Sequence, residues 1–387
     1  MASVTGKAVL AVDLGTSQIK AILYDVSSQQ SIGYTERSTV DCKVTGLPTG
    51  WSEASPQKIV GIASDVVDEL RSLASSKTEI VAITFTGAMH GILLVDDRGK
   101  PLTRLIDWQD QRVLQPNPTW GQSNLEHFRE RHGDRWASLT TGCQLASGYG
   151  LLTLYWLALS DSLPEKGGWL CTIVDFVASQ LTGIPLSTDY SLAASTGMFD
   201  IVNHRWCRDF LATIGVGNIE LPAVYPANSE IGEWQGIKVL APSGDHAAAV
   251  YGVMGAAHEK AHINIGTGSQ VAAYSHKPYF DPRFETRPGL TGDYLLVSAG
   301  SVGGHILDSW LKMIATLHPD VVDPLTLTSL LAEAETVPVH CDGLSMQPLF
   351  SGTRANPSLR GRIDGISPTN FSRGHLTRAC LTGIARE

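Results

Sequence analysis

The chain has 387 residues and a formal net charge of −9 at pH 7, and 43% of its residues are hydrophobic and 17% are charged. This length exceeds what one hydrophobic core usually supports, so we expect two domains, and the composition excludes a disordered chain. The negative charge and the lack of a basic cluster argue against nucleic acid as a partner. The six cysteines are scattered, so they indicate neither a zinc site nor a disulfide framework.

The sequence also argues against a membrane partner. Its longest apolar run, near residues 151–159, is far shorter than the roughly 20 residues that cross a bilayer. The apolar run at the N-terminus is interrupted by Asp13 and predicts a strand rather than a signal peptide. We therefore expect a cytoplasmic protein. Its oligomeric state stays open, and a homodimer is compatible with the sequence.

A short Gly-Thr phrase occurs twice, each time after a run that predicts a strand. Residues 7–12 precede Asp13-Leu-Gly-Thr-Ser-Gln18, and residues 261–265 lead into Gly266-Thr-Gly-Ser-Gln270. Glycine lets the backbone approach an anion, and the N–H and hydroxyl groups of Thr and Ser donate to phosphate oxygens. Two such hairpins would hold one polyphosphate between two related halves. The alternative is a pair of ordinary tight turns.

A βα alternation follows the first hairpin. The pattern predicts an amphipathic helix over residues 56–74 and a buried strand over residues 79–85. In open α/β sheets, ligand contacts gather in the loops at strand ends. Met89, His90 and residues 107–112 therefore lie where a substrate would be met.

The middle of the chain is predicted to be helical, and the second half then begins with another strand that leads into a helix. Residues 125–211 read as mainly helical, and a new strand over residues 237–241 then delivers Asp245 into an Ala-rich helix. We place the domain boundary just before that loop, which gives domains over residues 1–240 and 241–387.

Together these segments resemble the FGGY family of carbohydrate kinases. The matching segments run in order through the chain: Asp13-Leu-Gly-Thr-Ser17, Gly87-Ala-Met-His-Gly91, Trp108-Gln-Asp-Gln-Arg112, Ser243-Gly-Asp-His-Ala247, Asn264-Ile-Gly-Thr-Gly268, and a late segment from Gly352-Thr-Arg354 to Arg360-Gly-Arg-Ile-Asp-Gly365. The resemblance implies an α/β fold class, with two actin-like, ribonuclease-H-like ATPase domains around a central cleft. It also implies that the first domain binds sugar and the second binds nucleotide.

Two features resemble the sedoheptulokinase branch in particular. Thr153 stands where the wider family tends to place Lys, and Thr141-Gly-Cys143 is similar to that branch. The resemblance thus implies phosphoryl transfer from ATP, with Mg²⁺, to a primary hydroxyl of a ketose. Sedoheptulose is favoured, and xylulose and ribulose are the alternatives.

The resemblance assigns chemical roles to two carboxylates. Asp245 would be the general base, accepting the proton of the sugar hydroxyl as that hydroxyl attacks the γ-phosphorus; the alternative is a helix N-cap. Asp13 would hold Mg²⁺, since magnesium binds one or two carboxylates beside substrate phosphates. The alternative for Asp13 is a turn aspartate that accepts a local backbone N–H.

The remaining site residues sort into phosphate and sugar contacts. The expected phosphate contacts come from the two Gly-Thr turns: Gly15, Thr16, Ser17, Gly266, Thr267 and Gly268. The expected sugar contacts, besides Asp245, are Met89, His90, Trp108 and Asp110. Without the resemblance, His90 would read as a hydrogen-bonded structural histidine, and Trp108 could equally pack in the core.

The resemblance breaks at the C-terminus. The chain ends at Glu387 inside a helix expected to begin at Leu376, whereas complete family members continue with a segment that includes an adenosine-binding turn. We therefore expect a truncated second domain. Two hypotheses remain: an ATP-dependent ketose kinase, and a catalytically impaired sugar-binding or regulatory protein of the same fold. An actin-fold chaperone or cytoskeletal ATPase is disfavoured by Met89 and His90, which such proteins do not need.

Overall fold

The computed structural model describes residues 6–74, 78–265, 269–300, 303–317, 327–350 and 359–386. Its packing divides the chain into two compact units. The first unit comprises Met1–Lys260 with Ala273–Leu296, and the second comprises Ala261–Ala272 with Val297–Glu387. The expected domain boundary before residue 241 stays a prediction.

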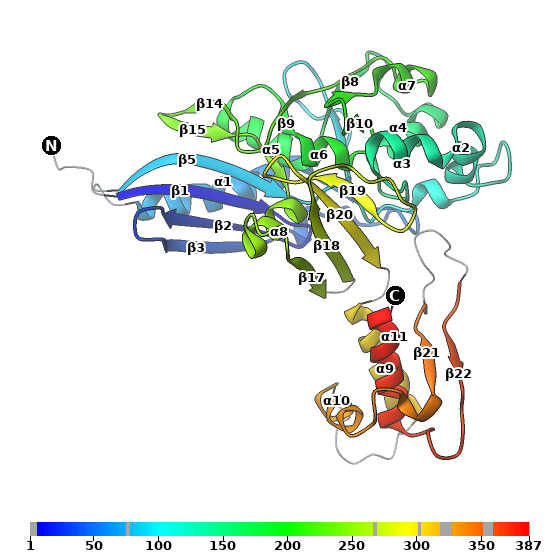
Figure 1. Cartoon of the computed structure of the whole chain (residues 1–387). Coiled ribbons are helices and arrows are strands. Elements are labelled where there is room, and N and C mark those ends of the chain that lie inside the picture. Colours follow the sequence, from blue (N-terminus) through cyan, green and yellow to red (C-terminus); the bar gives the residue numbers. More distant parts are fainter. Residues whose placement is uncertain are drawn as a thin grey trace. The chain divides into compact units, whose positions relative to one another are not determined.

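A twisted sheet forms the centre of the first unit (Figure 1). Strand β1 (Gly6–Leu14) lies between β2 (Gln18–Asp25), which runs antiparallel to it, and β5 (Thr78–Gly87), which runs parallel. The predicted first hairpin is thereby confirmed. Among the described residues the sheet has seven strands in the order β14-β15-β5-β1-β2-β3, and β16 also pairs with β5. The other members are β3 (Gln30–Ser38), β14 (Glu230–Trp234), β15 (Ile237–Leu240) and β16 (Ser243–Gly244).

Helix α1 (Pro56–Leu73) packs against β2 and β3. Ser55 starts it, because its side chain accepts the Lys58 N–H, and a proline fits the first helical position. The buried residues recur every three or four positions, as an amphipathic helix requires: Ile59, Ala63, Val66, Val67 and Leu70. The prediction of a helix over residues 56–74 is confirmed to within one residue.

The segment predicted to be mainly helical does contain most helices of the first unit, with short strands between them. The helices are α2 (Asn124–His132), α3 (Asp134–Thr141), α4 (Gly150–Leu159), α5 (Ile173–Thr182), α6 (Tyr190–Ser195) and α7 (Arg208–Thr213). The short strands in and around this segment are β4 (Glu53–Ala54), β6 (Leu93–Val95), β7 (Leu105–Ile106), β8 (Gly168–Cys171), β9 (Ser187–Asp189), β10 (Phe199–Asp200), β11 (Arg205–Trp206), β12 (Ile219–Glu220) and β13 (Ala223–Tyr225).

Helix α8 (Asp245–Met254) follows β16 and leads to a second sheet with the strand order β17-β18-β20-β19. These strands are β17 (Ala261–Ile265), β18 (Ser269–Ser275), β19 (Glu285–Pro288) and β20 (Tyr294–Gly300). The second unit has its own core, which includes Ile306, Trp310, Leu330 and Cys380. Its further elements are α9 (Gly304–Leu317), α10 (Leu327–Glu335), β21 (Ser345–Gln347), β22 (Arg362–Asp364) and α11 (Arg373–Arg386).

The last helix of the chain, expected from Leu376, begins three residues earlier, at Arg373. In the part of the chain that the structure describes, none of the helices has both the length and the apolar character needed to span a membrane.

Candidate active site

Asp13 and Asp245 lie at the same edge of the central sheet. Asp13 of β1 is in register with Thr86 of β5, and Thr86 is in register with Ser243 of β16. All three strands are parallel, so their C-terminal ends share one edge, and Asp245 follows β16 directly. Neighbouring strands are about 4.8 Å apart, which puts the backbones of Asp13 and Ser243 roughly 10 Å apart. Ligands of open α/β sheets bind at this edge.

Two glycines allow the strand ends to meet so closely. A Cβ atom on Gly87 would lie 2.6 Å from the carbonyl oxygen of Leu14, and one on Gly244 would lie 2.9 Å from Sδ of Met89. Real side chains essentially never approach so near: Gly87 faces fixed backbone and therefore requires glycine, whereas a side chain at Gly244 would force Met89 to shift. Met89 is buried and packs beneath the start of α8. Its predicted contact with sugar stays a prediction.

Asp245 is the first residue of α8 and not its cap. Gly244 occupies the N-cap position, and Oδ1 of Asp245 accepts the His246 N–H at 2.7 Å. The side chain is exposed, yet the surrounding protein displaces enough water to raise the pKa of Asp245 to about 6. The His246 N–H and Arg287 oppose this rise in pKa, and the negative charge of Asp13 adds to it.

Asp13 offers an unsatisfied carboxylate oxygen. Its Oδ1 is buried and has no hydrogen-bond partner among the described residues. Burial raises the pKa of Asp13, and Lys20, directly opposite on β2, lowers it. A buried carboxylate oxygen without a donor is costly unless a cation or water meets it. The residue therefore fits a hard cation such as Mg²⁺, which prefers carboxylate oxygen.

The first Gly-Thr turn lies beside Asp13. A Cβ on Gly15 would lie 2.8 Å from the Gln18 carbonyl oxygen, so the tight turn needs glycine. The Trp108 indole N–H donates to Oγ1 of Thr16 at 2.9 Å, and this Trp side chain is 40% exposed rather than buried in the core. Ser17 is exposed. The structure thus brings Trp108 to the turn that was predicted to contact phosphate.

The second Gly-Thr turn cannot be placed in the same way. Gly266, Thr267 and Gly268 lie outside the described residues, as do Gly352-Thr-Arg354 of the late signature. The strands that flank the turn, β17 and β18, are neighbours in their sheet.

His90 is held firmly within the first unit. Its backbone has a φ of 73°, in the left-handed region that non-glycine residues rarely adopt. The His90 N–H donates to Oγ of Ser195 at 3.2 Å, and Nδ1 lies 2.7 Å from the Ser195 carbonyl oxygen. The imidazole ring lies 4.4 Å from the ring of Tyr149. These contacts fix the orientation of the imidazole, and strain of this kind often gathers at functional sites.

A buried ion pair next to this histidine was missed at the sequence level. The Tyr149 hydroxyl donates to Oε1 of Glu285, and Arg287 donates to Oε2 of the same carboxylate from Nε, at 2.9 Å, and from a terminal nitrogen, at 2.5 Å. Both members of the pair are almost fully buried. Arg287 also lowers the pKa of Asp245. The alternation Glu-x-Arg on β19 was a weak signal, since it does not reveal the partner Tyr149.

Asp110 is buried, and its hydrogen-bonding capacity is largely used. Oδ2 accepts the Ser52 N–H at 2.7 Å, and three donors of Arg112 bond to the two carboxylate oxygens at 2.8 to 2.9 Å. The Arg112 guanidinium also lies 4.0 Å from the ring of Trp51. This arrangement braces the loop that carries Trp108, and the predicted contact of Asp110 with sugar stays a prediction.

A large hollow of about 1540 Å³ lies elsewhere in the first unit. Its lining includes Trp136, Trp169 and Trp206 but none of the predicted site residues. Pocket size therefore does not identify the reactive groups here. The candidate site rests instead on the convergence of Asp13, Asp245 and the first Gly-Thr turn, and the roles of these residues stay predictions.

Comparison with known proteins agrees with this geometry. The chain is 25% identical to the xylulose kinase of Bacillus subtilis, over 98% of this chain and 75% of that protein. It is 27% identical to the sedoheptulokinase of Mus musculus, over 97% of this chain and 84% of that protein. The structure matches the crystal structure of gluconate kinase from Lactobacillus acidophilus with a TM-score of 0.85 and 20% identity, covering 98% of this chain and 76% of that one.

The fold class is confirmed by the structural match as a mixed α/β fold of two-domain kinase architecture. The model of the N-terminal domain of the FGGY carbohydrate kinases matches residues 8–256, more than half of the chain. The chain therefore belongs to the FGGY family of carbohydrate kinases, which are phosphotransferases that act on an alcohol group.

Proposed function

We propose that this chain transfers the γ-phosphate of ATP to a primary hydroxyl of a ketose, with sedoheptulose favoured over xylulose and ribulose. The observation that carries the proposal is the position of Asp13 and Asp245 at the ends of parallel strands that both flank β5. One carboxylate has a raised pKa suited to accept a proton, and the other presents an orphaned oxygen suited to a cation. Phosphoryl transfer to an alcohol needs these two functions at one place.

Asp245 is the proposed general base. A carboxylate with a pKa of about 6 is mostly ionised at neutral pH, yet it is more basic than an ordinary aspartate. It accepts the proton of the sugar hydroxyl as the new O–P bond forms and the bond from the γ-phosphorus to the bridging oxygen breaks. ADP leaves with the electron pair of that bond.

Asp13 is the proposed magnesium residue. Mg²⁺, when bound, neutralises the charge that develops on the β- and γ-phosphate oxygens. Beside Asp13, Gly15, Thr16 and Ser17 supply backbone N–H and hydroxyl donors for phosphate oxygens. Gly266, Thr267 and Gly268 are proposed for the same role from the second turn.

The proposed sugar contacts are Met89, His90, Trp108 and Asp110, together with Asp245. A polyol is recognised by a few well-oriented polar groups, since the wrong sugar leaves such groups unpaired. The hydrogen bonds to Ser195 hold His90 in one orientation, as such recognition requires. The ketose itself is supported by the resemblance of the Met89-His90-Gly91 segment and by relatives named as xylulose kinase and sedoheptulokinase.

A coupled assay of ADP release with Mg-ATP tests the proposal. Purified chain is assayed with sedoheptulose, D-xylulose, D-ribulose, gluconate and glycerol, beside Asp245→Asn as the control. We expect ADP release with one ketose and none in the variant.

Two results would contradict parts of the proposal. Turnover with gluconate or glycerol alone would overturn the ketose assignment and leave the kinase intact. No ADP release with any acceptor, in a folded sample that still binds one of them, would instead support the alternative of a catalytically impaired sugar-binding protein.

A further inference from the structure

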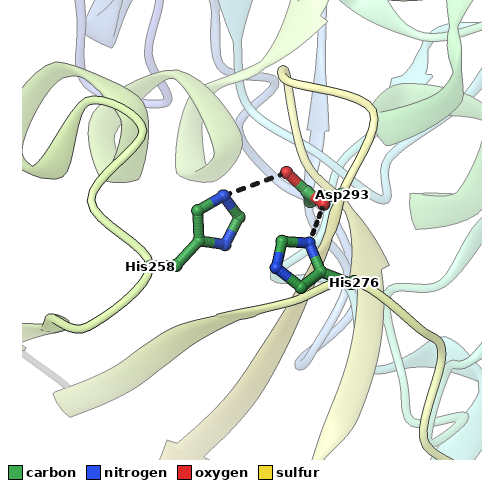
Figure 2. Close-up of side chains that lie close together, drawn as sticks. All are labelled: His258, His276 and Asp293. Carbon is green, nitrogen blue, oxygen red and sulfur yellow. Dashed lines mark hydrogen bonds and ion pairs between the residues drawn. The ribbon is translucent and has the colours of Figure 1, made fainter.

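A second set of metal-binding side chains lies away from Asp13. His258 follows α8, His276 follows β18, and Asp293 precedes β20 (Figure 2). The cysteine spacing predicted no zinc site, and these three residues are far apart in the sequence. Among the described residues, they form a group whose ligand atoms all lie within 4.8 Å of one another.

Each of the two imidazole rings points one nitrogen at a different oxygen of the Asp293 carboxylate (Figure 2). Nε2 of His258 lies 3.3 Å from Oδ2 of Asp293, and Nδ1 of His276 lies 2.9 Å from Oδ1. A tetrahedral ion with bonds of 2.0 to 2.1 Å holds its ligand atoms roughly 3.3 Å apart. The two histidine–carboxylate separations are close to this value, and all three ligand atoms lie within 4.8 Å of one another, so rotations of the side chains would admit an ion.

Further contacts hold Asp293 and His258 in place. The Thr291 hydroxyl donates to Oδ2 of Asp293 at 3.2 Å, and the Asp293 carbonyl oxygen accepts the Gly289 N–H at 2.7 Å. On the other side, the ring of Tyr274 lies 5.0 Å from that of His258, and its hydroxyl donates to the Gly255 carbonyl oxygen. Outer contacts of this kind orient ligands and strengthen a metal site.

We propose that His258, His276 and Asp293 bind one divalent transition-metal ion of the zinc type. Two imidazoles and one carboxylate suit Zn²⁺, Co²⁺ or Ni²⁺, whereas Mg²⁺ and Ca²⁺ prefer oxygen ligands. Three protein ligands leave a fourth position for water. The ion links the turn after α8 to the segments around β18 and β20, so it fastens the C-terminal end of the helix that begins at Asp245.

A similar trio in the second unit provides a matched control. His375 Nε2 lies 3.1 Å from Oδ2 of Asp342, but Nδ1 of His340 already accepts the Asp342 N–H and lies 3.6 Å from Oδ1. That histidine nitrogen cannot offer the same lone pair to an ion. This control trio is therefore not expected to chelate.

The test is a zinc titration of tag-free, EDTA-treated protein by calorimetry, with Co²⁺ absorption spectra as the second readout. We expect one equivalent of Zn²⁺ to bind at micromolar concentration in the presence of millimolar Mg²⁺, with a rise in Tm. Visible Co²⁺ bands should saturate at the same stoichiometry.

His276→Ala and Asp293→Asn should each weaken zinc binding at least tenfold and abolish the rise in Tm. The side chain of His276 is 75% exposed, so its removal should not unfold the protein. Asp342→Asn should bind zinc like the wild type. The proposal is overturned if the wild type binds no stoichiometric Zn²⁺, if His276→Ala binds it equally well, or if Asp342→Asn loses it to the same extent.

Discussion

Two carboxylates in the first unit occupy opposite environments. Asp110 is 2% exposed and accepts four hydrogen bonds, three of them from Arg112. Asp245 is exposed, and Oδ1 accepts the N–H of the next residue. The buried carboxylate has used most of its hydrogen-bonding capacity on structure, whereas the exposed one keeps capacity to accept a further hydrogen bond. Burial and hydrogen-bond partners together therefore separate the bracing Asp110 from Asp245, the proposed base.

The largest effect should come from removing the reactive carboxylate. Asp245→Asn is expected to lower kcat by about 10² to 10⁴, the usual contribution of a general base. The same variant should raise Tm at pH 7.5. The folded-state pKa of Asp245 lies above the ordinary 3.8, so the native protein disfavours the charge that asparagine removes. Calorimetry of both proteins checks this, and a lower Tm with unchanged kcat would reverse the assignment.

Removing the charge of Asp110, the bracing carboxylate, should lower stability, whereas removing that of Asp245 should raise it. Asp110→Asn removes one of the two carboxylates that Arg112 binds, the other being Glu53, and is expected to lower the free energy of unfolding by about 2 kcal/mol. Urea denaturation measures this loss. The control Glu230→Gln breaks the exposed pair with Lys238 and should cost under about 1 kcal/mol. Equal losses in the two variants would remove the distinction between bracing and exposed carboxylates.

Replacing Asp13 should change the Mg²⁺ requirement of the activity more than it changes the stability of the fold. Asp13→Asn is expected to raise the Mg²⁺ concentration for half-maximal activity by about tenfold, the equivalent of one weakened carboxylate contact. Asp25→Asn is the control, because Asp25 lies at the other end of the β1–β2 hairpin, opposite Ala8. A magnesium titration that is the same for both variants would remove Asp13 from the metal site.

The smallest effect is the acid limb of the pH profile. Asp245 must be ionised to accept a proton, and its pKa is raised to about 6, so kcat/KM should fall tenfold per unit below that pH and stay flat between 7 and 8. Stability follows the opposite course: the raised pKa favours the folded state at low pH, and this contribution fades as pH rises from 3.8 to about 6. An acid limb near pH 4 would contradict the shift.

Local sequence patterns predicted the individual helices and strands better than they predicted which strands pair with one another. Residues 56–74 have a helical period, and residues 7–12 form a short apolar run typical of a buried strand, so α1 and β1 were foreseen. The alignment of Asp13 with Ser243 across β5 depends on pairings between distant segments, which no local period encodes.

The candidate site was predicted in the same uneven way. The motifs singled out Asp13, Asp245 and Thr16, but the bond of Glu285 to Tyr149 was missed because these two residues are far apart in the sequence and only tertiary packing brings them together. The N-cap alternative for Asp245 also required the structure, since Gly244 and Asp245 are both acceptable caps in sequence.

The pairing of β1 on both sides predicts how fast its backbone amides exchange with solvent. The strand is paired along its length, with β2 on one side and β5 on the other. Amides in such a doubly bonded central strand exchange with solvent only when much of the domain opens, whereas the first amides of a helix exchange readily. Deuterium uptake should therefore be slow at Asp13 and fast at the start of α8. The proposed metal residue, Asp13, therefore lies on a strand that opens only with much of the domain, whereas the proposed base, Asp245, lies at a helix start whose amides exchange readily.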